Sequence, residues 1–183
     1  MCALKIELIR GIDNLPIEGN IVELAPKHVD DFVNLWLEQL REFETEDKEW
    51  DWLFKLDFIN RNSEFEGYAL EAEGSTQGLM KIETQRHGSH EVYGQKLVYV
   101  EFLASAPWNR KTIQRPPRFR GVGINLLRYA RIRSVQLGYG GRVGLHSLPG
   151  SVRFYDNQLM DNFGPDEYKE DLIYFEYGPL RRR

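Results

Sequence analysis

The residues best suited to chemistry lie between Lys96 and Leu137, in the stretch Arg118-Phe119-Arg120-Gly121-Val122-Gly123. An apolar run from Leu97 to Ala104 precedes it, with the length and the β-branched and aromatic content typical of a strand. Small and apolar residues then recur at helical spacing: Gly123, Leu126, Leu127, Ala130, Ser134 and Leu137. A strand, a glycine loop and a helix N-terminus in this order can bind phosphate, because the first N–H groups of a helix are unpaired and glycine lets an oxyanion approach the backbone.

Charge is distributed very unevenly along the chain. No Asp or Glu occurs between Phe102 and Tyr155, whereas ten basic residues do: Arg110, Lys111, Arg115, Arg118, Arg120, Arg128, Arg131, Arg133, Arg142 and Arg153. The whole chain has a net charge of −4. This basic span therefore favours a polyanionic ligand, and a solvated basic face without a ligand is the alternative.

Length and composition indicate the class of protein. A chain of 183 residues with 42% hydrophobic and 28% charged residues is typical of one globular domain, expected over residues 1–183. No apolar run is long enough to span a membrane, and the N-terminus lacks a signal-peptide pattern. Cys2 is the only cysteine, which excludes a disulfide framework and a cysteine-based metal site. We expect a cytoplasmic protein that uses no metal and has no membrane partner.

The rest of the chain supplies the elements that must position the loop. Strands are expected at 4–9, 21–24, 66–73, 77–85, 142–146 and 172–177, a turn region at 11–19, and helices at 26–43, 47–60 and 152–160. The apolar run, the central helix and strand 142–146 form a crossover unit, which implies locally parallel pairing. The expected fold is α/β (α+β), with a mixed, mostly antiparallel central sheet and helices on both faces.

Two common phosphate loops do not fit the glycine pattern. A P-loop needs Gly-Lys-Ser/Thr at the start of the helix, where Gly123-Ile124-Asn125 stands. A dinucleotide-binding Rossmann loop needs a third glycine where Leu126 stands. It also needs its glycines directly after the strand, whereas about fifteen residues intervene here.

The pattern Arg118-x-x-Gly121-x-Gly123, after a strand that ends in Leu103-Ala104-Ser105, resembles the acyl-CoA pyrophosphate loop of the GNAT superfamily of N-acetyltransferases. Phe154-Tyr155 near the start of the next helix adds to the resemblance, which extends from the helix after Pro26 to Tyr177. It implies a GNAT-like sheet with a splayed parallel strand pair at the acyl-CoA site, and acetyl-CoA as co-substrate.

The resemblance also implies roles for individual residues. The backbone of Leu103, Ala104 and Ser105 would pair with the pantetheine arm, and a backbone N–H near Leu103 would polarise the thioester carbonyl. Tyr155 would protonate the leaving CoA thiolate. Arg118 and the other basic loop residues would bind the phosphates through their side chains. The backbone N–H groups of one segment would bind the pyrophosphate: Phe119, Arg120, Gly121, Val122, Gly123 and Ile124.

Three candidates for the general base stay open. Glu101 shares a strand face with Tyr99 and Leu103, and its apolar neighbours can raise its pKa toward the value that a base needs. His146, at the end of a short strand, is the second candidate, and ordered water is the third. Either side chain could instead be purely structural.

Three features depart from the family pattern. Leu159-Met160 stands where the family usually has a glycine and an aromatic residue, and Leu148 stands where asparagine is frequent. The link from Trp108 to Pro117 is longer than usual. These departures concern the thiol end of the site and the acceptor.

The resemblance implies an acetyl-CoA-dependent N-acetyltransferase that moves an acetyl group to a primary amine by direct attack in a ternary complex. The acceptor would be a small-molecule or protein amine, and the acidic segment 42–51 favours a cationic one. Homodimers are frequent in such families. The alternative is a catalytically degenerate acyl-CoA-binding sensor or structural module. The acidic remainder of the chain and the lack of a nucleic-acid motif disfavour a nucleic-acid partner.

Overall fold

The computed structural model describes residues 3–180, so Cys2 and the arginines at 181–183 lie outside it. The described residues divide into a first unit, residues 3–81 and 102–126, and a second unit, residues 82–101 and 127–180. The single domain expected over residues 1–183 stays a prediction.

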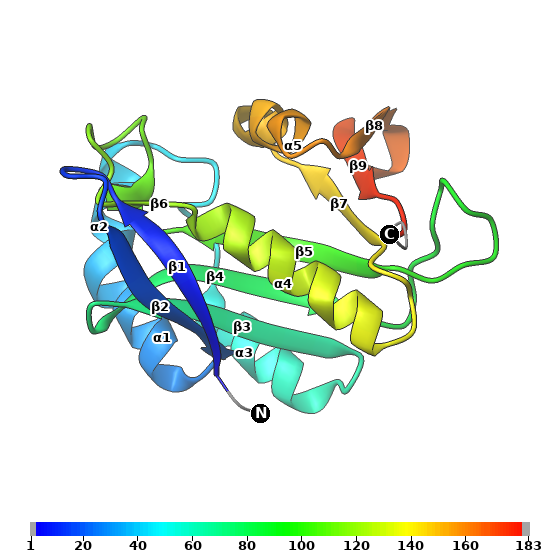
Figure 1. Cartoon of the computed structure of the whole chain (residues 1–183), viewed down its shortest axis with the longest axis horizontal. Helices are drawn as coiled ribbons and strands as arrows, with labels where there is room; N and C mark the ends of the chain where they lie inside the picture. The colour runs from blue at the N-terminus through cyan, green and yellow to red at the C-terminus, as the bar shows by residue number, and fades with distance from the viewer. Residues whose placement is uncertain (1–2, 181–183) are drawn as a thin grey trace. The chain divides into compact units, whose positions relative to one another are not determined.

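Residues 3–180 form a mixed sheet of nine strands in the order β6-β1-β2-β3-β4-β5-β7-β9-β8 (Figure 1). The strands are β1 (Leu4–Arg10), β2 (Pro16–Glu23), β3 (Phe65–Ala72), β4 (Ser75–Glu83), β5 (Val98–Ser105), β6 (Phe119–Arg120), β7 (Val143–Ser147), β8 (Asp161–Asp166) and β9 (Leu172–Tyr177). Strands β5 and β7 pair in parallel, whereas β1–β2, β1–β6, β2–β3, β7–β9 and β8–β9 are antiparallel. The mixed, mostly antiparallel sheet with a parallel pair is therefore confirmed.

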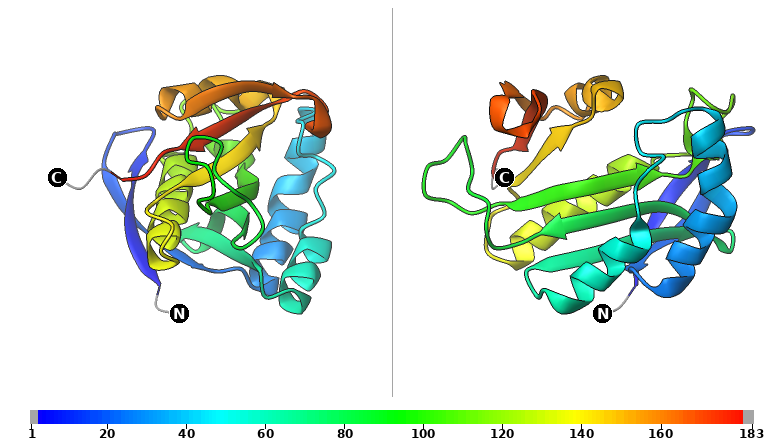
Figure 2. Two further views of the ribbon diagram at one scale, coloured as in Figure 1. Left: turned by 90° about the vertical axis from the view of Figure 1, so that its right-hand side faces the viewer. Right: turned by 180° about the vertical axis from the view of Figure 1, so that it is seen from behind.

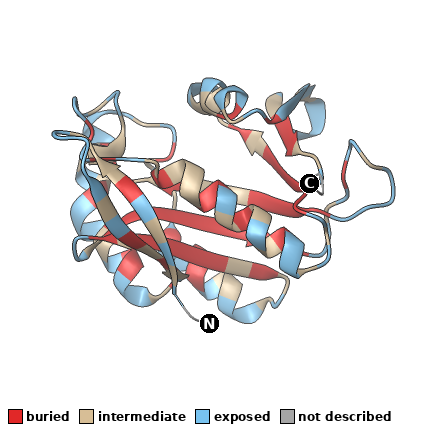
Figure 3. Cartoon of the chain, viewed as in Figure 1, coloured by how far each residue is buried: buried red, intermediate tan, exposed pale blue. Residues whose placement is uncertain are grey.

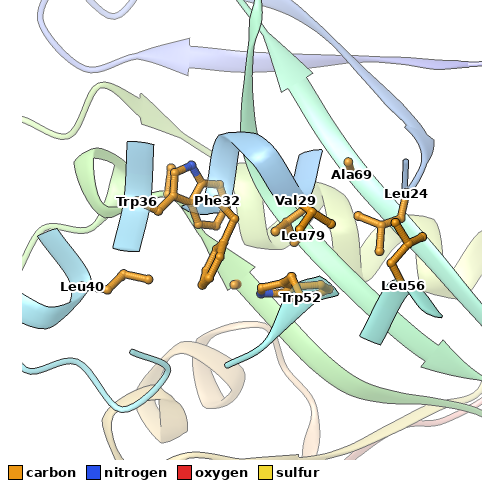
Figure 4. Packing of buried hydrophobic residues seen from close by; sticks show 11 residues of the cluster. Leu24, Val29, Phe32, Trp36, Leu40, Trp52, Leu56, Ala69 and Leu79 are labelled. Carbon is orange, nitrogen blue, oxygen red and sulfur yellow. The ribbon is translucent and has the colours of Figure 1, made fainter. Parts of the chain in front are cut away.

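Four helical segments cover one face of the sheet in the first unit. Helices α1 (Pro26–Asp31) and α2 (Leu37–Glu42) are joined by a π-helical segment, Phe32–Trp36, and α3 spans Trp52–Arg61 (Figure 2). Their buried side chains pack with Ala69 of β3 and Leu79 of β4 (Figure 4). The ring centroid of Phe32 lies 5.5 Å from that of Trp36 and 6.4 Å from that of Trp52. Aromatic contacts therefore join these helices to one another, and the aliphatic residues of the cluster pack them on the strands.

Helix α4 (Val122–Gln136) has the buried face that the sequence predicted. Leu126, Leu127, Ala130 and Ser134 are all buried, and Figure 3 shows buried, intermediate and exposed positions along this helix. At the C-terminal end, the Ser134 hydroxyl donates a hydrogen bond to the Arg142 carbonyl at 2.7 Å. Helix α5 (Val152–Asn157) follows β7.

Several predicted boundaries were wrong. Helix α3 begins at Trp52 rather than near Asp47, because the Asp51 carboxylate accepts the Phe54 N–H at 2.9 Å and caps the helix there. Residues 16–19, predicted as part of a turn, belong to β2 because they pair with β1. Strands β6 and β8 were not predicted at all, and α5 ends at Asn157, earlier than expected.

None of the helices in residues 3–180 has the length and apolar character needed to cross a membrane. No group of three or more His, Cys, Asp or Glu side chains in the same residues is placed to hold a metal ion.

Candidate functional site

The predicted phosphate loop forms β6 and the start of α4, both in the first unit. Strand β6 pairs with β1, with Arg120 opposite Ile9 and Phe119 opposite Arg10. Gly121 follows with φ +97°, a left-handed conformation that favours glycine. The N–H groups of the first turn of this 15-residue helix have no partner inside the helix and carry the positive end of its dipole. The structure thus places a glycine turn directly at a helix N-terminus.

Two amide side chains that the sequence analysis did not single out hold this loop. The Asn109 Oδ1 accepts the Phe119 N–H at 2.9 Å, and Gln77 Oε1 accepts from Asn109 Nδ2 at 3.0 Å. Gln77 is fully buried in β4. The Phe119 N–H is therefore used inside the protein, so a bound anion would meet the N–H groups that follow it. Neutral amides 32 residues apart give no motif from which this support could have been predicted.

Gly78 of β4 lets the first turn of α4 approach the sheet closely. A Cβ atom at Gly78 would lie 2.6 Å from Val122 Cγ1 and 2.9 Å from Leu126 Cδ1. The neighbouring Leu79 belongs to the cluster under the first helices. Because successive strand residues face opposite sides of a sheet, the start of α4 lies on the other face. The absence of a side chain at Gly78 thus allows the N-terminus of α4 to pack directly against β4.

Basic side chains beside the loop are paired with carboxylates of the first unit. Arg118 Nη2 lies 2.9 Å from Glu73 Oε2, in the turn between β3 and β4. Arg10 Nη1 lies 3.9 Å from the other oxygen of Glu73, and Arg10 also pairs with Asp13. The side chains of Arg118 and Arg10 are 41% and 35% exposed. Exposed pairs are weak, so an anionic ligand can replace these carboxylates. Arg10 was missed because it lies outside the basic span and reaches the loop only through the β1–β6 pairing.

Arg110, by contrast, serves a structural ion pair. Its Nη1 donates to Asp47 Oδ1 at 2.8 Å, and its Nε donates to the Ser105 carbonyl at 2.9 Å. Burial acts to raise the pKa of Asp47, but hydrogen bonds and the charge of Arg110 outweigh burial and lower this pKa overall. The acidic segment that was expected to attract an acceptor is thus partly neutralised at Asp47.

The residues predicted to pair with pantetheine, Leu103–Ser105, form the end of β5. The parallel register between β5 and β7 joins Val98–Val100 to Val143–Leu145, whereas β5 continues to Ser105. Leu103 and Ser105 are half-buried, and Ala104 is buried. The part of β5 that pairs with β7 therefore ends before Leu103.

Tyr155, the predicted proton donor, lies in α5 of the second unit. Its side chain is buried, and its ring centroid lies 5.0 Å from that of Phe154 and 5.6 Å from that of Phe175. Burial raises the pKa of its hydroxyl. Tyr155 therefore keeps its proton at neutral pH, as a general acid must.

The two side chains considered as bases are also in the second unit. Glu101 is half-buried on β5. His146 on β7 is bonded at both ring nitrogens: Nδ1 lies 2.8 Å from the Tyr99 hydroxyl and Nε2 lies 2.9 Å from Asp166 Oδ2. Burial lowers the pKa of His146, although Asp166 acts in the opposite direction. Burial, more than the charge of Glu101, raises the pKa of Tyr99 to about 12.

Several solved structures have a fold similar to that of this chain. No family model and no curated protein matches the sequence. Among solved structures, the N-acetyltransferase YlbP of Bacillus subtilis in complex with coenzyme A is 14% identical, with a TM-score of 0.55 over 88% of this chain and 97% of that one. An aminoglycoside 6′-acetyltransferase type Ii is 15% identical, with a TM-score of 0.59 over 89% and 99%.

A third solved structure carries the family name. It is a protein of Desulfovibrio desulfuricans assigned as an acetyltransferase of the GNAT family, 12% identical, with a TM-score of 0.60 over 87% of this chain and 98% of that one. These similarities span nearly the whole length of each compared protein. The chain thus has the fold of the GNAT acetyltransferases, and the resemblance read from the sequence is confirmed at the level of the fold.

Proposed function

We propose that this chain is an acetyl-CoA-dependent N-acetyltransferase that moves an acetyl group to a primary amine by direct attack in a ternary complex. The observation that carries the proposal is the left-handed Gly121 turn at the N-terminus of α4, supported by Asn109 and flanked by Arg118. It occurs in a fold shared with an N-acetyltransferase that binds coenzyme A.

The first unit has groups that suit the phosphates of coenzyme A. The N–H groups from Gly121 to Ile124 and the helix dipole would bind the pyrophosphate. Arg118 and Arg10 would exchange Glu73 for phosphate oxygens, which form strong charge-assisted hydrogen bonds with guanidinium groups. The backbone of Leu103–Ser105 would pair with pantetheine. Acetyl-CoA itself supplies the activated acetyl group.

The second unit has the groups that suit proton transfer. Tyr155 would donate its proton to the departing thiolate, because burial keeps its hydroxyl protonated. Glu101 would act as the base that accepts the proton of the acceptor ammonium. In the first unit, a backbone N–H near Leu103 would stabilise the negative charge that develops on the carbonyl oxygen.

The acceptor would be a small-molecule or protein amine. Five exposed carboxylates, Glu42, Glu44, Glu46, Glu49 and Asp51, lie in the acidic segment beside the paired Asp47, and they favour a cationic acceptor. One compared enzyme is an aminoglycoside acetyltransferase, which makes amino sugars reasonable first compounds to test. A cytoplasmic location and a homodimer stay predictions.

Calorimetric titration with acetyl-CoA tests the proposal. We expect micromolar binding by the wild type and at least about tenfold weaker binding by Gly121→Ala, since an Ala at φ +97° costs about 1–2 kcal/mol and opens the turn. Gly138→Ala is the matched control, because Gly138 also has a positive φ, +82°, but lies after the C-terminus of α4. A wild type that binds neither acetyl-CoA nor free CoA would contradict every acyl-CoA proposal.

A second expected result concerns the carboxylate that occupies Arg118. Glu73→Gln should strengthen acetyl-CoA binding by about two- to fivefold, because a surface pair worth up to about 1 kcal/mol no longer competes for the guanidinium. Glu38→Gln is the control, since it removes an exposed carboxylate from the first turn of α2. Weaker binding by Glu73→Gln would show that Glu73 positions Arg118 rather than competing for it.

The alternative is an acyl-CoA-binding module without turnover. It is favoured by Leu159, which is exposed with φ +59° where the family usually has the glycine of its glycine–aromatic pair. A thiol-release assay with acetyl-CoA and spermidine, kanamycin or tyramine separates the two. Binding without thiol release from any amine would support the module.

A further inference from the structure

The second unit contains a cluster of ionisable and aromatic side chains that the proposed reaction has not used. It includes three of the four histidines of the chain. Its members are Glu83, His87, His90, Tyr99, His146, Asp166, Tyr174 and Glu176. They come from strands β4, β5, β7, β8 and β9 and the loop before β5. Such a concentration of titratable groups goes beyond what packing of a strand face requires.

Three of these residues form a directed hydrogen-bond chain. Asp166 Oδ1 accepts a hydrogen bond from the Tyr168 N–H at 2.9 Å. This bond and the hydrogen bond with His146 lower the pKa of Asp166. An ionised carboxylate can only accept, so His146 must donate its Nε2–H to Asp166. The Nδ1 atom then carries the lone pair and accepts the hydroxyl proton of Tyr99 at 2.8 Å. The order of donation is therefore Tyr99 to His146 to Asp166.

Two other members, His87 and Glu83, hold the Tyr99 ring in place. His87 stacks on it with ring centroids 3.9 Å apart and an interplanar angle of 10°. His87 Nδ1 lies 2.7 Å from Glu83 Oε2, and the buried Glu83 also accepts the Arg86 N–H at 2.8 Å. The hydroxyl of Tyr99 is thus aimed at His146 by a rigid support.

A second tyrosine in the cluster is organised differently. Tyr174 lies beside His146, with ring centroids 5.0 Å apart. Its hydroxyl donates to Glu176 at 3.0 Å instead. The cluster therefore contains one tyrosine that is bonded to the histidine and one that only packs against it.

We propose that Tyr99, His146 and Asp166 form a proton relay that carries the acceptor proton away from Glu101. This inference rests on the proposed function. Glu101 lies two residues from Tyr99, so both side chains project from the same face of β5. The electrostatic effect of Glu101 on Tyr99 agrees with this placement.

The proton balance of the relay closes without another reactant. Protonated Glu101 gives its proton to the Tyr99 oxygen while the Tyr99 hydroxyl gives its own proton to His146 Nδ1. Glu101 returns to the carboxylate, Tyr99 keeps one proton, and His146 becomes an imidazolium paired with Asp166. The Asp166 side chain is 27% exposed, which gives the proton a path to solvent. Tyr99, His146 and Asp166 are positioning and relay residues rather than groups that touch the acceptor.

The charges around His146 set the pH at which the relay works. Groups that face it are Asp166 of β8, Lys169 after β8, His87 before β5, Tyr99 of β5 and Tyr174 of β9. Burial is the largest influence on the pKa of His146 and lowers it, and Lys169 and His87 act in the same direction. His146 therefore stays neutral down to a pH below the ordinary imidazole value of about 6.5, and can accept a proton near neutrality.

The first test is the pH profile of kcat/KM, measured with acetyl-CoA and whichever of spermidine, kanamycin or tyramine releases thiol fastest. We expect an acid limb at the pKa of His146. His146→Gln and Tyr99→Phe should each lower kcat by about tenfold, less than the usual 10²–10⁴-fold contribution of a proton-transfer group, because water can still take the Glu101 proton. Both should remove this limb and leave the acetyl-CoA affinity unchanged. Tyr174→Phe, the matched control, should keep the wild-type limb.

The second test does not depend on turnover. Nitrogen-15 NMR of the histidine rings should show His146 as the Nε2–H tautomer, and Asp166→Asn should lower the pKa of His146 further, because the carboxylate favours the imidazolium. A Nδ1–H tautomer would overturn the relay. An unchanged pH limb in an active Tyr99→Phe variant would overturn the relay and leave the acetyltransferase proposal standing. A wild type that binds no acetyl-CoA would overturn both.

Discussion

Tyr155→Phe is expected to lower kcat for acetyl transfer by about 10²–10⁴-fold, the usual contribution of a positioned proton donor. Burial raises the pKa of Tyr155, so its hydroxyl is protonated when the thiolate departs. Phe keeps the ring that packs against Phe154 and Phe175. The variant should therefore fold normally and bind acetyl-CoA with the affinity of the wild type. Steady-state thiol release and calorimetry measure the two quantities separately.

Tyr139→Phe is the matched control for this experiment. It also removes one tyrosine hydroxyl from the second unit, where Tyr139 donates to the Thr84 carbonyl at 2.7 Å. That loss should cost about 1 kcal/mol of stability and leave kcat within about twofold of the wild type. A Tyr155→Phe variant with wild-type kcat would assign thiolate protonation to another group or to solvent. It would leave the CoA site itself unaffected.

Elements with strong local patterns could be predicted from the sequence. Strand β9 was predicted with its observed bounds, because Leu172–Tyr177 is a continuous run of apolar and aromatic residues. The buried face of α4 followed from its helical spacing. Strand β8 was missed because Asp-Asn-Phe-Gly-Pro-Asp has the composition of a turn. It is a strand only because β9 offers it a partner, with an irregularity in register between Asn162 and Pro165.

In the candidate site, too, features set by neighbouring residues could be predicted, whereas contacts between residues far apart in sequence could not. The glycine turn and the helix after it could be located, since both depend on residues adjacent in sequence. The supports could not, because Gln77, Asn109 and Phe119 meet only after folding. Charge patterning likewise marked an acidic segment and a basic span, but it could not show that Asp47 and Arg110, 63 residues apart, pair with each other. Charges that looked available for ligands are partly used by the fold.

Asp47→Ala is expected to lower the free energy of unfolding by about 3–5 kcal/mol, the usual cost of removing one partner of a buried ion pair. The side chains of Asp47 and Arg110 are only 7% and 18% exposed, so the substitution leaves a guanidinium with little access to water. Glu18→Ala is the control, because its pair with Lys5 is mostly exposed and should contribute less than about 1 kcal/mol. Urea denaturation measures both.

The pH dependence of this loss separates the ion pair from simple packing. The pKa of Asp47 is lower in the folded protein than in the unfolded chain, where it is about 3.9. The stabilisation is therefore fully present above about pH 4 and is lost as the pH falls through the folded-state pKa. The difference in stability between the wild type and Asp47→Asn should shrink in that acidic range. A difference that stays constant down to the lowest pH would assign the loss to packing.

The same ion pair should matter for the donor site, because Arg110 also binds the Ser105 carbonyl at the end of β5. Arg110→Met keeps much of the side-chain volume but removes the donor. Together with Asp47→Ala it should recover part of the stability, since no buried charge is then left unpaired. If Arg110 positions the backbone of Leu103–Ser105, the double variant should still bind acetyl-CoA more weakly than the wild type. Restored stability together with restored affinity would show that the strand end holds its shape without Arg110.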